Sequence, residues 1–567
     1  MTESRFGKPK GSSMKTETNN ILTNKYYLYM TEFFAGMSVM AVELGASRLL
    51  APYFSSSQIV WTIIIGTIMI AMALGNIYGG KSADKNPNSD KLYLRLIVAA
   101  VWIAAIPVVG KYIIIVVSGL LILAVSNHFL IVAAFIACML IFVYPLFLLG
   151  TVTPSLAKYT VESLEDNGKT VGALGAFNTV GSILGTFLPT FVTIPAVGTS
   201  ITFLIFSGIL LLLGVLYFLN VKRGKAACAI SLALFLLCSI LGHSGSFAFW
   251  EDDLVYEGES IYNYLQVKET ERSVTLSTNV LFGVQSIRMK DDSLTGMYYD
   301  YALAAPLMAG VTQKDAADIL ILGMGTGTYA TQCRKYFDYV NVEGVEIDQK
   351  ITDLAGRYFE LPDSVEVTTY DGRAYLQAVD KKYDVIMVDA YQDITIPFQM
   401  SSVEFFAEVK EHLKESGVMV VNMNMNMKSD TADGEGINAY LADTIASVFD
   451  TVYTADVKGM TNRELFASDN PDLERRLTKG ADDLVARAEN EAAGMDTARE
   501  DVQLAKMMRA VAGTLQAYEG GGLILTDDKA PVEVLGMQVI DELIRGEIGY
   551  YKNIFREEGI RGLLGTM

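Results

Sequence analysis

Charged residues are scarce in this sequence. They account for 19% of its 567 residues, whereas hydrophobic residues account for 51%. Soluble domains carry about 25% charged residues, so the shortage favours a membrane protein. Its distribution is uneven. Several apolar runs of about 20 residues, long enough to cross a bilayer, lie between Tyr27 and Gly242, and no such run recurs after Trp250.

Cysteine and histidine are also rare. The four cysteines stand apart, with Cys138, Cys228 and Cys238 in apolar runs and Cys333 in the second half. Neither a disulfide framework nor a zinc-binding spacing is present, and with three scattered histidines we expect no metal site. The net charge is −19, with most of the acidic excess in the second half. This charge excludes the basic surface that binds nucleic acid and favours a cationic partner.

A signal-peptide cleavage pattern is missing from the basic N-terminal tail, residues 1–25. The first apolar run is therefore expected to remain as a membrane span. We predict a transmembrane domain of about eight helices over residues 26–245, with spans at 27–50, 59–80, 92–110, 111–126, 129–150, 171–193, 199–220 and 226–243.

Basic residues orient these spans. A basic tail precedes the first span and the basic segment 81–95 follows the second, which places both in the cytoplasm. Eight spans then return the C-terminal domain to the cytoplasm, so we predict an integral protein of the plasma membrane with a cytoplasmic catalytic domain. The basic segment 222–225 disagrees, because it faces outward in this arrangement. Six spans, with 111–126 and 226–243 re-entrant or interfacial, satisfy every basic loop and form the alternative.

Glu43 and Arg48 are charged residues that lie inside or near the end of the first predicted span. A charge in hydrocarbon costs at least about 2.5 kcal/mol and tends to be retained for a reason. The two residues either form a structural pair or line a polar cavity or substrate path. Small-residue pairs at Gly75–Gly79 and Gly181–Gly185 favour close helix packing.

The second half begins with strand-like sequence. The segments SIYNYLQVKET, SVTLSTN and VQSIRM alternate in polarity or are rich in β-branched residues, which predicts a small β domain over residues 246–310. From residue 311 to 567, short buried strands alternate with helices, the pattern of a doubly wound, Rossmann-like α/β domain.

A glycine-rich turn follows the first strand of that α/β domain, in ILILGMGTGT at 319–328. Gly323, Gly325 and Gly327 permit a tight turn and let backbone N–H groups approach a ligand at the start of a helix. The next strand ends in Glu346, about 20 residues after Gly323, where a Rossmann-type fold positions a carboxylate on ribose hydroxyls. The pattern predicts a nucleoside cofactor site of the S-adenosylmethionine type.

Three more acids follow the later strands. Asp371 and Gly372 end the third strand, where they either contact an adenine edge or, for Asp371, cap the helix RAYLQAV. Asp389 follows the buried run YDVIMV, a position for a general base or a cation anchor. Asp393 either assists Asp389 or is a solvated loop acid.

Taken together, the second half resembles the spermidine synthase family of aminopropyltransferases, and the whole chain resembles its membrane-fused bacterial branch. The membrane half carries the resemblance in ELGASRLLAPYF, GNIYGGKSAD, LLGTVTPSLAK and GSILGTFLPTF. The second half carries it in GESIYNYLQV, FGVQS, YYDYALAAP, VEIDQK, YDGRAYL and TDDKAPVE. The resemblance implies a class I methyltransferase-like catalytic domain and an enzyme of polyamine synthesis.

The resemblance also implies residue roles. In the cofactor site, which takes decarboxylated S-adenosylmethionine, Gln285 contacts the cofactor tail, Glu346 the ribose and Asp371 the adenine. In the acceptor site, Asp389 deprotonates or orients the attacking amine and Tyr298 helps to place it. An amine must lose a proton to attack the carbon beside a sulfonium, and a nearby carboxylate accepts that proton.

From the same family resemblance we predict that Tyr299 and Asp393 are further substrate contacts. The expected partners are a small-molecule amine, the lipid bilayer and, in a homodimer, a second copy of the chain.

Two other functions stay open. Thr326 stands where the family usually carries an acid, and the GMGTG turn also looks like that of methyltransferases. An S-adenosylmethionine-dependent methyltransferase acting on a membrane-delivered acceptor is therefore one alternative. A polyamine transport or sensing module is the other, and Glu43 supplies the motive for it.

Overall fold

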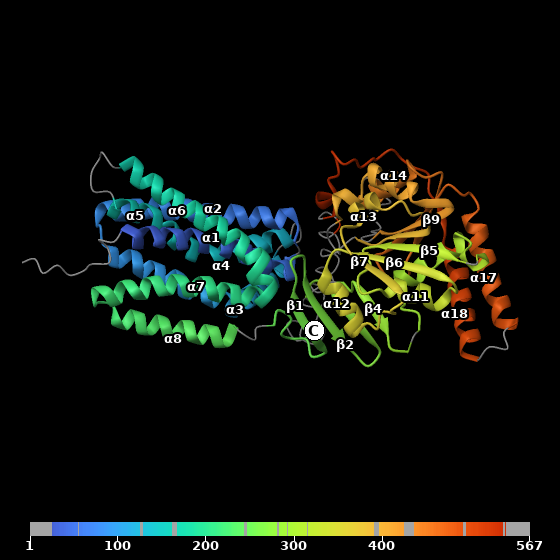
Figure 1. Ribbon diagram of the computed structural model, residues 1–567, viewed down its shortest axis with the longest axis horizontal. Helices are drawn as coiled ribbons and strands as arrows, with labels where there is room; N and C mark the ends of the chain where they lie inside the picture. The colour runs from blue at the N-terminus through green and yellow to red at the C-terminus, as the bar shows by residue number, and fades with distance from the viewer. Residues whose placement is uncertain are drawn as a thin grey trace, which may run out of the picture.

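The computed structural model describes residues 25–54, 56–124, 129–160, 167–242, 246–280, 283–291, 293–314, 316–390, 396–423, 436–490, 495–536 and 539. Over these residues the chain forms a helical bundle, then a four-stranded sheet, then an eight-stranded sheet flanked by helices. The bundle lies at one end of the molecule and the two sheets at the other (Figure 1).

The bundle contains most of the apolar sequence. In its described residues the helices are α1 (Lys25–Phe54), α2 (Gln58–Lys85), α3 (Ser89–Ala124), α4 (Phe129–Gly150), α5 (Val152–Thr160), α6 (Asn167–Leu188), α7 (Ile194–Val221) and α8 (Lys225–Gly242). Six stretches in this described part are long and apolar enough to cross a membrane, and the longest of them, 168–221, joins α6 and α7 through the π-helical turn Pro189–Thr193.

The predicted division of 92–126 into two spans is wrong, because α3 runs through both segments as one helix. Lys111, the charge at the predicted boundary, does not end the helix. Its ammonium donates a hydrogen bond to the carbonyl oxygen of Ser246 at 2.8 Å, just beyond the end of α8. The side chain therefore meets a polar partner without breaking the helix.

Helix α6 packs against α1 at two glycines. A Cβ added to Gly181 would stand 2.0 Å from the carbonyl oxygen of Phe33, and one added to Gly185 would stand 2.1 Å from that of Met37. The close approach confirms the predicted small-residue packing of Gly181 and Gly185. Since both contacts advance in the same direction along the two helices, α6 runs parallel to α1.

Helix α7 runs the opposite way. Gly198 has φ 81° and ψ 169°, a conformation outside the helical region, and it turns the chain back. A Cβ on Gly45 in α1 would stand 2.7 Å from the ring of Phe203, whereas Tyr27, earlier in α1, donates to the carbonyl oxygen of Leu213 at 2.5 Å. The stretch 168–221 therefore traverses the bundle twice.

Contacts of the same kind give the directions of the other helices. In the described residues, α1, α3, α6 and α8 run toward the sheets, and α2, α4 and α7 run away from them (Figure 1). We call the end of the bundle at Phe54, Gln58 and Thr199 the docking end, and the end at Lys85 and Val221 the basic end. The described helices thus traverse the bundle an odd number of times, whereas eight spans would be an even number, and the number of membrane spans stays a prediction.

A four-stranded antiparallel sheet follows the bundle, in the order β1 (Leu254–Glu259), β2 (Tyr264–Glu269), β3 (Ser273–Ser277) and β4 (Ser286–Met289). Buried Leu265, Val267, Val274 and Leu276 pack against α12 (Gln349–Tyr358). The three predicted strand segments all lie in this sheet. Whether residues 246–310 form a separate domain stays a prediction.

The eight-stranded sheet has the order β12-β10-β11-β9-β8-β5-β6-β7. Its parallel strands are β5 (Ala317–Leu322), β6 (Val340–Glu346), β7 (Val365–Thr369), β8 (Tyr383–Val388) and β9 (Leu413–Met423). Antiparallel β11 (Arg463–Ser468), β10 (Thr451–Asp456) and β12 (Gln516–Ala517) complete one edge.

Helices cover this sheet, including α11 (Thr328–Tyr336), α13 (Gly372–Ala378), α14 (Val403–Glu411), α16 (Ile437–Ala446), α17 (Leu473–Asn490) and α18 (Met495–Ala512). The predicted Rossmann-like α/β fold is confirmed by the strand order, in which β5 starts in the centre and the chain winds outward in both directions. The carboxyl ends of the parallel strands are where such folds bind their ligands.

Gly185→Leu should destabilise the bundle, because the new side chain meets the backbone of α1. We expect a loss of about 1–3 kcal/mol, typical of overpacking, seen as a lower melting temperature of the detergent-solubilised protein. Gly175→Leu on the same helix is the control, since no atom lies within 4 Å of its added Cβ. Equal melting temperatures for the two variants would contradict the observed α1–α6 contact.

Candidate active site

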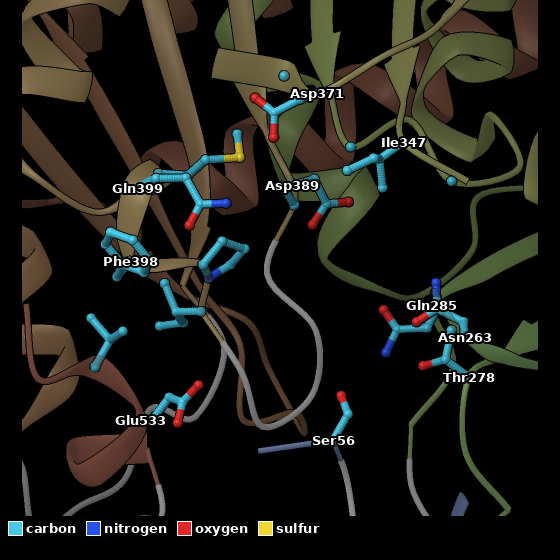
Figure 2. Close-up of a pocket in the computed structure, with 18 of the residues that line it drawn as sticks. Ser56, Asn263, Thr278, Gln285, Ile347, Asp371, Asp389, Phe398, Gln399 and Glu533 are labelled. Carbon is cyan, nitrogen blue, oxygen red and sulfur yellow. The ribbon is translucent and has the colours of Figure 1, made fainter. Parts of the chain in front are cut away.

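One cavity of about 700 Å³ opens at the carboxyl ends of the parallel strands. Its size is that of a site for a small organic ligand. Asp371, Asp389, Gln285 and Glu533 surround the same space (Figure 2). Of the predicted site residues, those that line the cavity are Gln285, Tyr298, Gly323, Gly325, Glu346, Asp371, Gly372 and Asp389.

The glycine turn forms one wall. Gly323, Gly325 and Gly327 have φ values of 84°, 58° and 88°, a region that L side chains rarely adopt. A Cβ on Gly323 would also stand 2.6 Å from the backbone of Ala390. Gly323 and Gly325 line the cavity, whereas Gly327 precedes α11 and its added Cβ would meet Leu361 at 2.3 Å. Gly327 thus serves the packing of the turn.

Glu346 ends β6 and its carboxylate closes the turn. One oxygen, Oε2, accepts from the backbone N–H of Gly325 at 2.9 Å, and Oε1 accepts from that of Asp348 at 3.0 Å. Burial raises the pKa of the Glu346 carboxyl to about 7 in spite of these two donors, which lower it. The remaining lone pairs on both oxygens are available to donors in the cavity, as ribose hydroxyls are.

The Asp371 side chain caps a helix and also lines the cavity. Its Oδ1 accepts from the backbone N–H of Ala374 at 2.9 Å, so the side chain caps α13 as one of the two sequence hypotheses expected. It also lines the cavity beside Gly372. Contact with adenine stays a prediction, and the helix cap that fixes the carboxylate is compatible with it.

Asp389 follows β8 and lines the cavity. Its Oδ2 accepts from the hydroxyl of Tyr298 at 2.8 Å, and Oδ1 accepts from the side-chain amide of Asn422 at 2.9 Å. Burial raises the pKa of Asp389 to about 7, the two hydrogen bonds lower it, and the charge of Glu346 raises it further. Such a carboxyl changes protonation near neutral pH, as a general base must.

Asn422 was missed by the sequence analysis. It lies in β9 within the apolar run GVMVVNM, and its amide oxygen accepts from the side chain of Asn462 at 2.8 Å. A buried amide inside an apolar strand is itself a signal, because its polar atoms need partners. Here the partners are Asp389 on one side and Asn462 on the other.

Glu464 is a second carboxyl that the sequence analysis missed. It pairs with Asn422 across β9 and β11 and is fully buried, and among the described residues neither of its oxygens has a hydrogen-bond partner. Burial raises its pKa well above the ordinary value, and the charge of Asp389 adds to the effect. We infer that Glu464 is protonated at neutral pH, because a buried unpaired carboxylate is too costly.

The two predicted tyrosines differ in position. Both begin α9 (Tyr298–Ala302), with ring centroids 4.1 Å apart. Tyr298 lines the cavity, whereas Tyr299 donates to the backbone carbonyl of Gln285 at 2.6 Å. The Tyr299 hydroxyl is thus held at the backbone of Gln285, and its role as a substrate contact stays a prediction. Asp393 lies outside the described residues.

The docking end of the bundle forms the floor of the cavity. Ser56, Gln58, Ile59 and Thr62 line it, and Figure 2 shows Ser56 facing the same space as Glu533. The backbone N–H of Gln58 donates to Glu533 Oε2 at 3.0 Å. Glu533 belongs to the TDDKAPVE segment, so this late segment joins the cavity to the start of α2.

The hydrogen-bond partner of Arg48 is not Glu43, the partner considered from the sequence. Its guanidinium donates to the backbone carbonyl of Ile261 in the C-terminal half. The suggested structural pair with Glu43 is therefore replaced, for Arg48, by a contact across the docking end.

Comparison with known proteins bears on this site. Residues 302–454 match the family model of the spermine/spermidine synthase domain. A probable polyamine aminopropyl transferase of Bifidobacterium longum is 54% identical over 357 residues, which cover 62% of this chain and 77% of that protein. A polyamine aminopropyltransferase of Vibrio vulnificus is 30% identical over 195 residues, which cover 33% of this chain and 64% of that protein.

Among solved structures, a probable spermidine synthase from Corynebacterium glutamicum superposes with a TM-score of 0.35 at 19% identity, over 41% of this chain and 86% of that one.

The raised pKa of Asp389 predicts how stability depends on pH. The folded chain binds the proton more tightly than the unfolded chain, so stability falls as the pH rises from about 4 to about 7. In Asp389→Asn this loss should shrink by on the order of 3 kcal/mol between pH 5 and pH 8. Melting temperatures of the purified full-length protein measure it. Exposed Asp363→Asn is the control, and an unchanged pH dependence in Asp389→Asn refutes the assignment.

Proposed function

Because this chain belongs to the polyamine aminopropyltransferase family, we propose that its cavity binds decarboxylated S-adenosylmethionine and transfers the aminopropyl group to a small amine. The observation that carries the proposal is the position of Asp389. A buried carboxyl with a pKa raised to about 7 and a tyrosine hydroxyl at 2.8 Å shares one cavity with the glycine turn and Glu346.

On the cofactor side, Glu346 accepts the ribose hydroxyls with the lone pairs that Gly325 and Asp348 leave free. Asp371, held in place as the cap of α13, accepts from the adenine amino group. Gln285 stands across the cavity from Asp371 and contacts the tail that carries the sulfonium (Figure 2). These roles fit the order in which the strands deliver the residues.

On the acceptor side, Asp389 binds the amine and takes its proton. The amine nitrogen then attacks the aminopropyl carbon bonded to sulfur, a C–N bond forms as the C–S bond breaks, and the electron pair passes to the sulfur of the leaving methylthioadenosine. Tyr298 and Asn422 hold the Asp389 carboxylate from two sides, so its orientation is fixed before the amine arrives. Positioning and proton transfer are the contributions of this chain.

Methyl transfer from S-adenosylmethionine is the second candidate. Thr326, which stands where the family usually has an acid, is buried, and its backbone N–H donates to Ser286 Oγ at 3.0 Å. No carboxylate is supplied to an aminopropyl ammonium from that position. The two candidates leave different products, so one assay separates them.

The bundle anchors the enzyme in a bilayer. Exposed apolar side chains such as Met69, Leu120, Phe191 and Ile240 point out from four of its helices, and lipid is the solvent that accommodates them. We place the enzyme in the plasma membrane.

Incubation of the purified full-length protein with decarboxylated S-adenosylmethionine and a diamine should release methylthioadenosine and a longer polyamine in equal amounts, detected by mass spectrometry. Asp389→Asn should slow this release about 10²- to 10⁴-fold, the usual contribution of a general base. With S-adenosylmethionine instead, formation of S-adenosylhomocysteine and a methylated acceptor would establish the methyltransferase and reject aminopropyl transfer.

A further inference from the structure

Basic residues of the bundle gather at one end. At the basic end, each connection between helices carries lysine or arginine in or beside it: Lys81, Lys85, Lys91 and Arg95 around the α2–α3 turn, Lys158 and Lys169 around the α5–α6 connection, and Lys222, Arg223 and Lys225 around the α7–α8 turn. The N-terminal tail, which leads into α1 at this end, adds Arg5, Lys8, Lys10 and Lys15.

The docking end has the opposite composition. The sequence has neither lysine nor arginine between the helix ends that lie there, that is, between Phe54 and Gln58, between Ala124 and Phe129, and between Leu188 and Ile194. The two basic side chains near this end, Arg48 and Lys111, are helix residues and donate to backbone carbonyls of Ile261 and Ser246. Lysine and arginine therefore lie in the connections of the basic end and not in those of the docking end.

This asymmetry determines the orientation of a membrane protein. Lysine and arginine in short loops near the ends of the spans are retained on the cytoplasmic side, and acidic residues contribute little to the rule. The basic end is thus the cytoplasmic end. The sheets lie at the other end of the bundle (Figure 1). The cavity lies there too, because Ser56 and Gln58 of the docking end line it.

We propose that the C-terminal half, with its cavity, lies on the outer side of the membrane. The cytoplasmic placement expected from the sequence required an even number of spans, and the described helices traverse the bundle an odd number of times. The arrangement also removes the one conflict in the earlier assignment, since segment 222–225 now lies with the other basic loops. The amines within reach of the cavity are then extracytoplasmic, and a transport step must supply the adenosyl compound to that side.

Cysteine labelling in spheroplasts tests the orientation. In a chain with its four cysteines replaced by alanine, Asp363→Cys reports on the C-terminal half and Lys85→Cys on the basic end, both at exposed positions. A membrane-impermeant thiol reagent should label Asp363→Cys in intact spheroplasts and Lys85→Cys only after permeabilisation. The reverse pattern overturns the proposal.

Wild-type chain gives a second measurement that does not depend on the cysteine-free variant. Trypsin added outside intact spheroplasts should degrade the C-terminal half and leave a fragment of the bundle. A C-terminal half that resists trypsin until the membrane is permeabilised also overturns the proposal. Neither result depends on which group the enzyme transfers.

A second inference rests on a separate observation, a buried chain of hydrogen bonds from α7 to the cofactor wall. Just after the Gly198 turn, the backbone N–H and the hydroxyl of Thr199 donate to the two carboxylate oxygens of Glu259, at 2.7 and 2.6 Å. Glu259 is buried at the end of β1, and its backbone carbonyl accepts from the ammonium of Lys350 at 2.5 Å.

The chain continues to Glu346. Ser260, next to Glu259, donates to Asp348 Oδ2 at 2.5 Å, and Asn263 donates to the same oxygen at 3.1 Å. The backbone N–H of Asp348 donates in turn to Glu346 Oε1 at 3.0 Å. A buried network with its members satisfied has one geometry, so it transmits the position of one end to the other.

We infer that Glu259 is a positioning residue through which the bundle holds Glu346 in place for the ribose of the adenosyl ligand. The inference rests on the proposed function only for the identity of that ligand. Burial raises the pKa of Glu259, and the two donors of Thr199, followed by the charges of Arg48 and Lys350, stabilise its carboxylate against that burial. Removing the Thr199 hydroxyl weakens the start of the chain without adding volume.

Thr199→Val should weaken binding of methylthioadenosine to the full-length protein about tenfold, the loss of a hydrogen bond to a charged group, and raise KM for the adenosyl substrate with kcat nearly unchanged. Thr190→Val is the matched control, because the Thr190 hydroxyl donates to Thr186 of its own chain segment. Equal affinities in wild type and Thr199→Val overturn the inference. If no protein binds methylthioadenosine, the proposed function fails instead.

Discussion

The contact between the carboxyl edge of the parallel sheet and the docking end of the bundle is the constraint on which the cavity depends. The edge supplies Glu346, Asp371 and Asp389 from three strands, and the bundle supplies a floor from Ser56 to Thr62. Carboxyl groups at a strand edge are ordinarily solvated. Here burial is the largest cause of the raised pKa of Glu346 and Asp389.

The cavity contains two acids whose pKa values are near 7, and this makes it selective for the charge of a ligand. Each loses its proton at a cost, and the negative charge of Glu346 increases that cost for Asp389. A cationic ligand offsets the repulsion, because opposite charge within a few ångströms favours the ionised form. The same geometry that opposes ionisation of Glu346 and Asp389 therefore favours sulfonium and ammonium ligands over neutral ones.

The bundle contacts the cavity at one end and carries the basic loops at the other. Glycines let α1 and α6 approach until a Cβ would overlap the backbone, which gives the bundle a rigid axis. At one end of that axis lie the basic loops, and at the other lie Thr199, Gln58 and the contacts that reach Glu346 and Glu533. The same packed helices therefore connect the basic end of the bundle with the wall of the cavity.

The sequence by itself determined what depends on local pattern. Apolar runs predicted the long helices of the bundle, and strand-like segments predicted β2, β3, β4 and the five parallel strands. The glycine turn with acids after successive strands predicted most of the polar cavity wall, since residues after parallel strands meet at one edge. Tertiary structure decided what depends on contacts between distant segments. Lys111 lies inside one continuous α3 and donates to Ser246, Tyr299 donates to the backbone of Gln285, and Asn422 donates to Asp389 from the neighbouring strand β9. Partners so far apart in the chain leave no periodicity in it, and their meeting follows only from the packed fold.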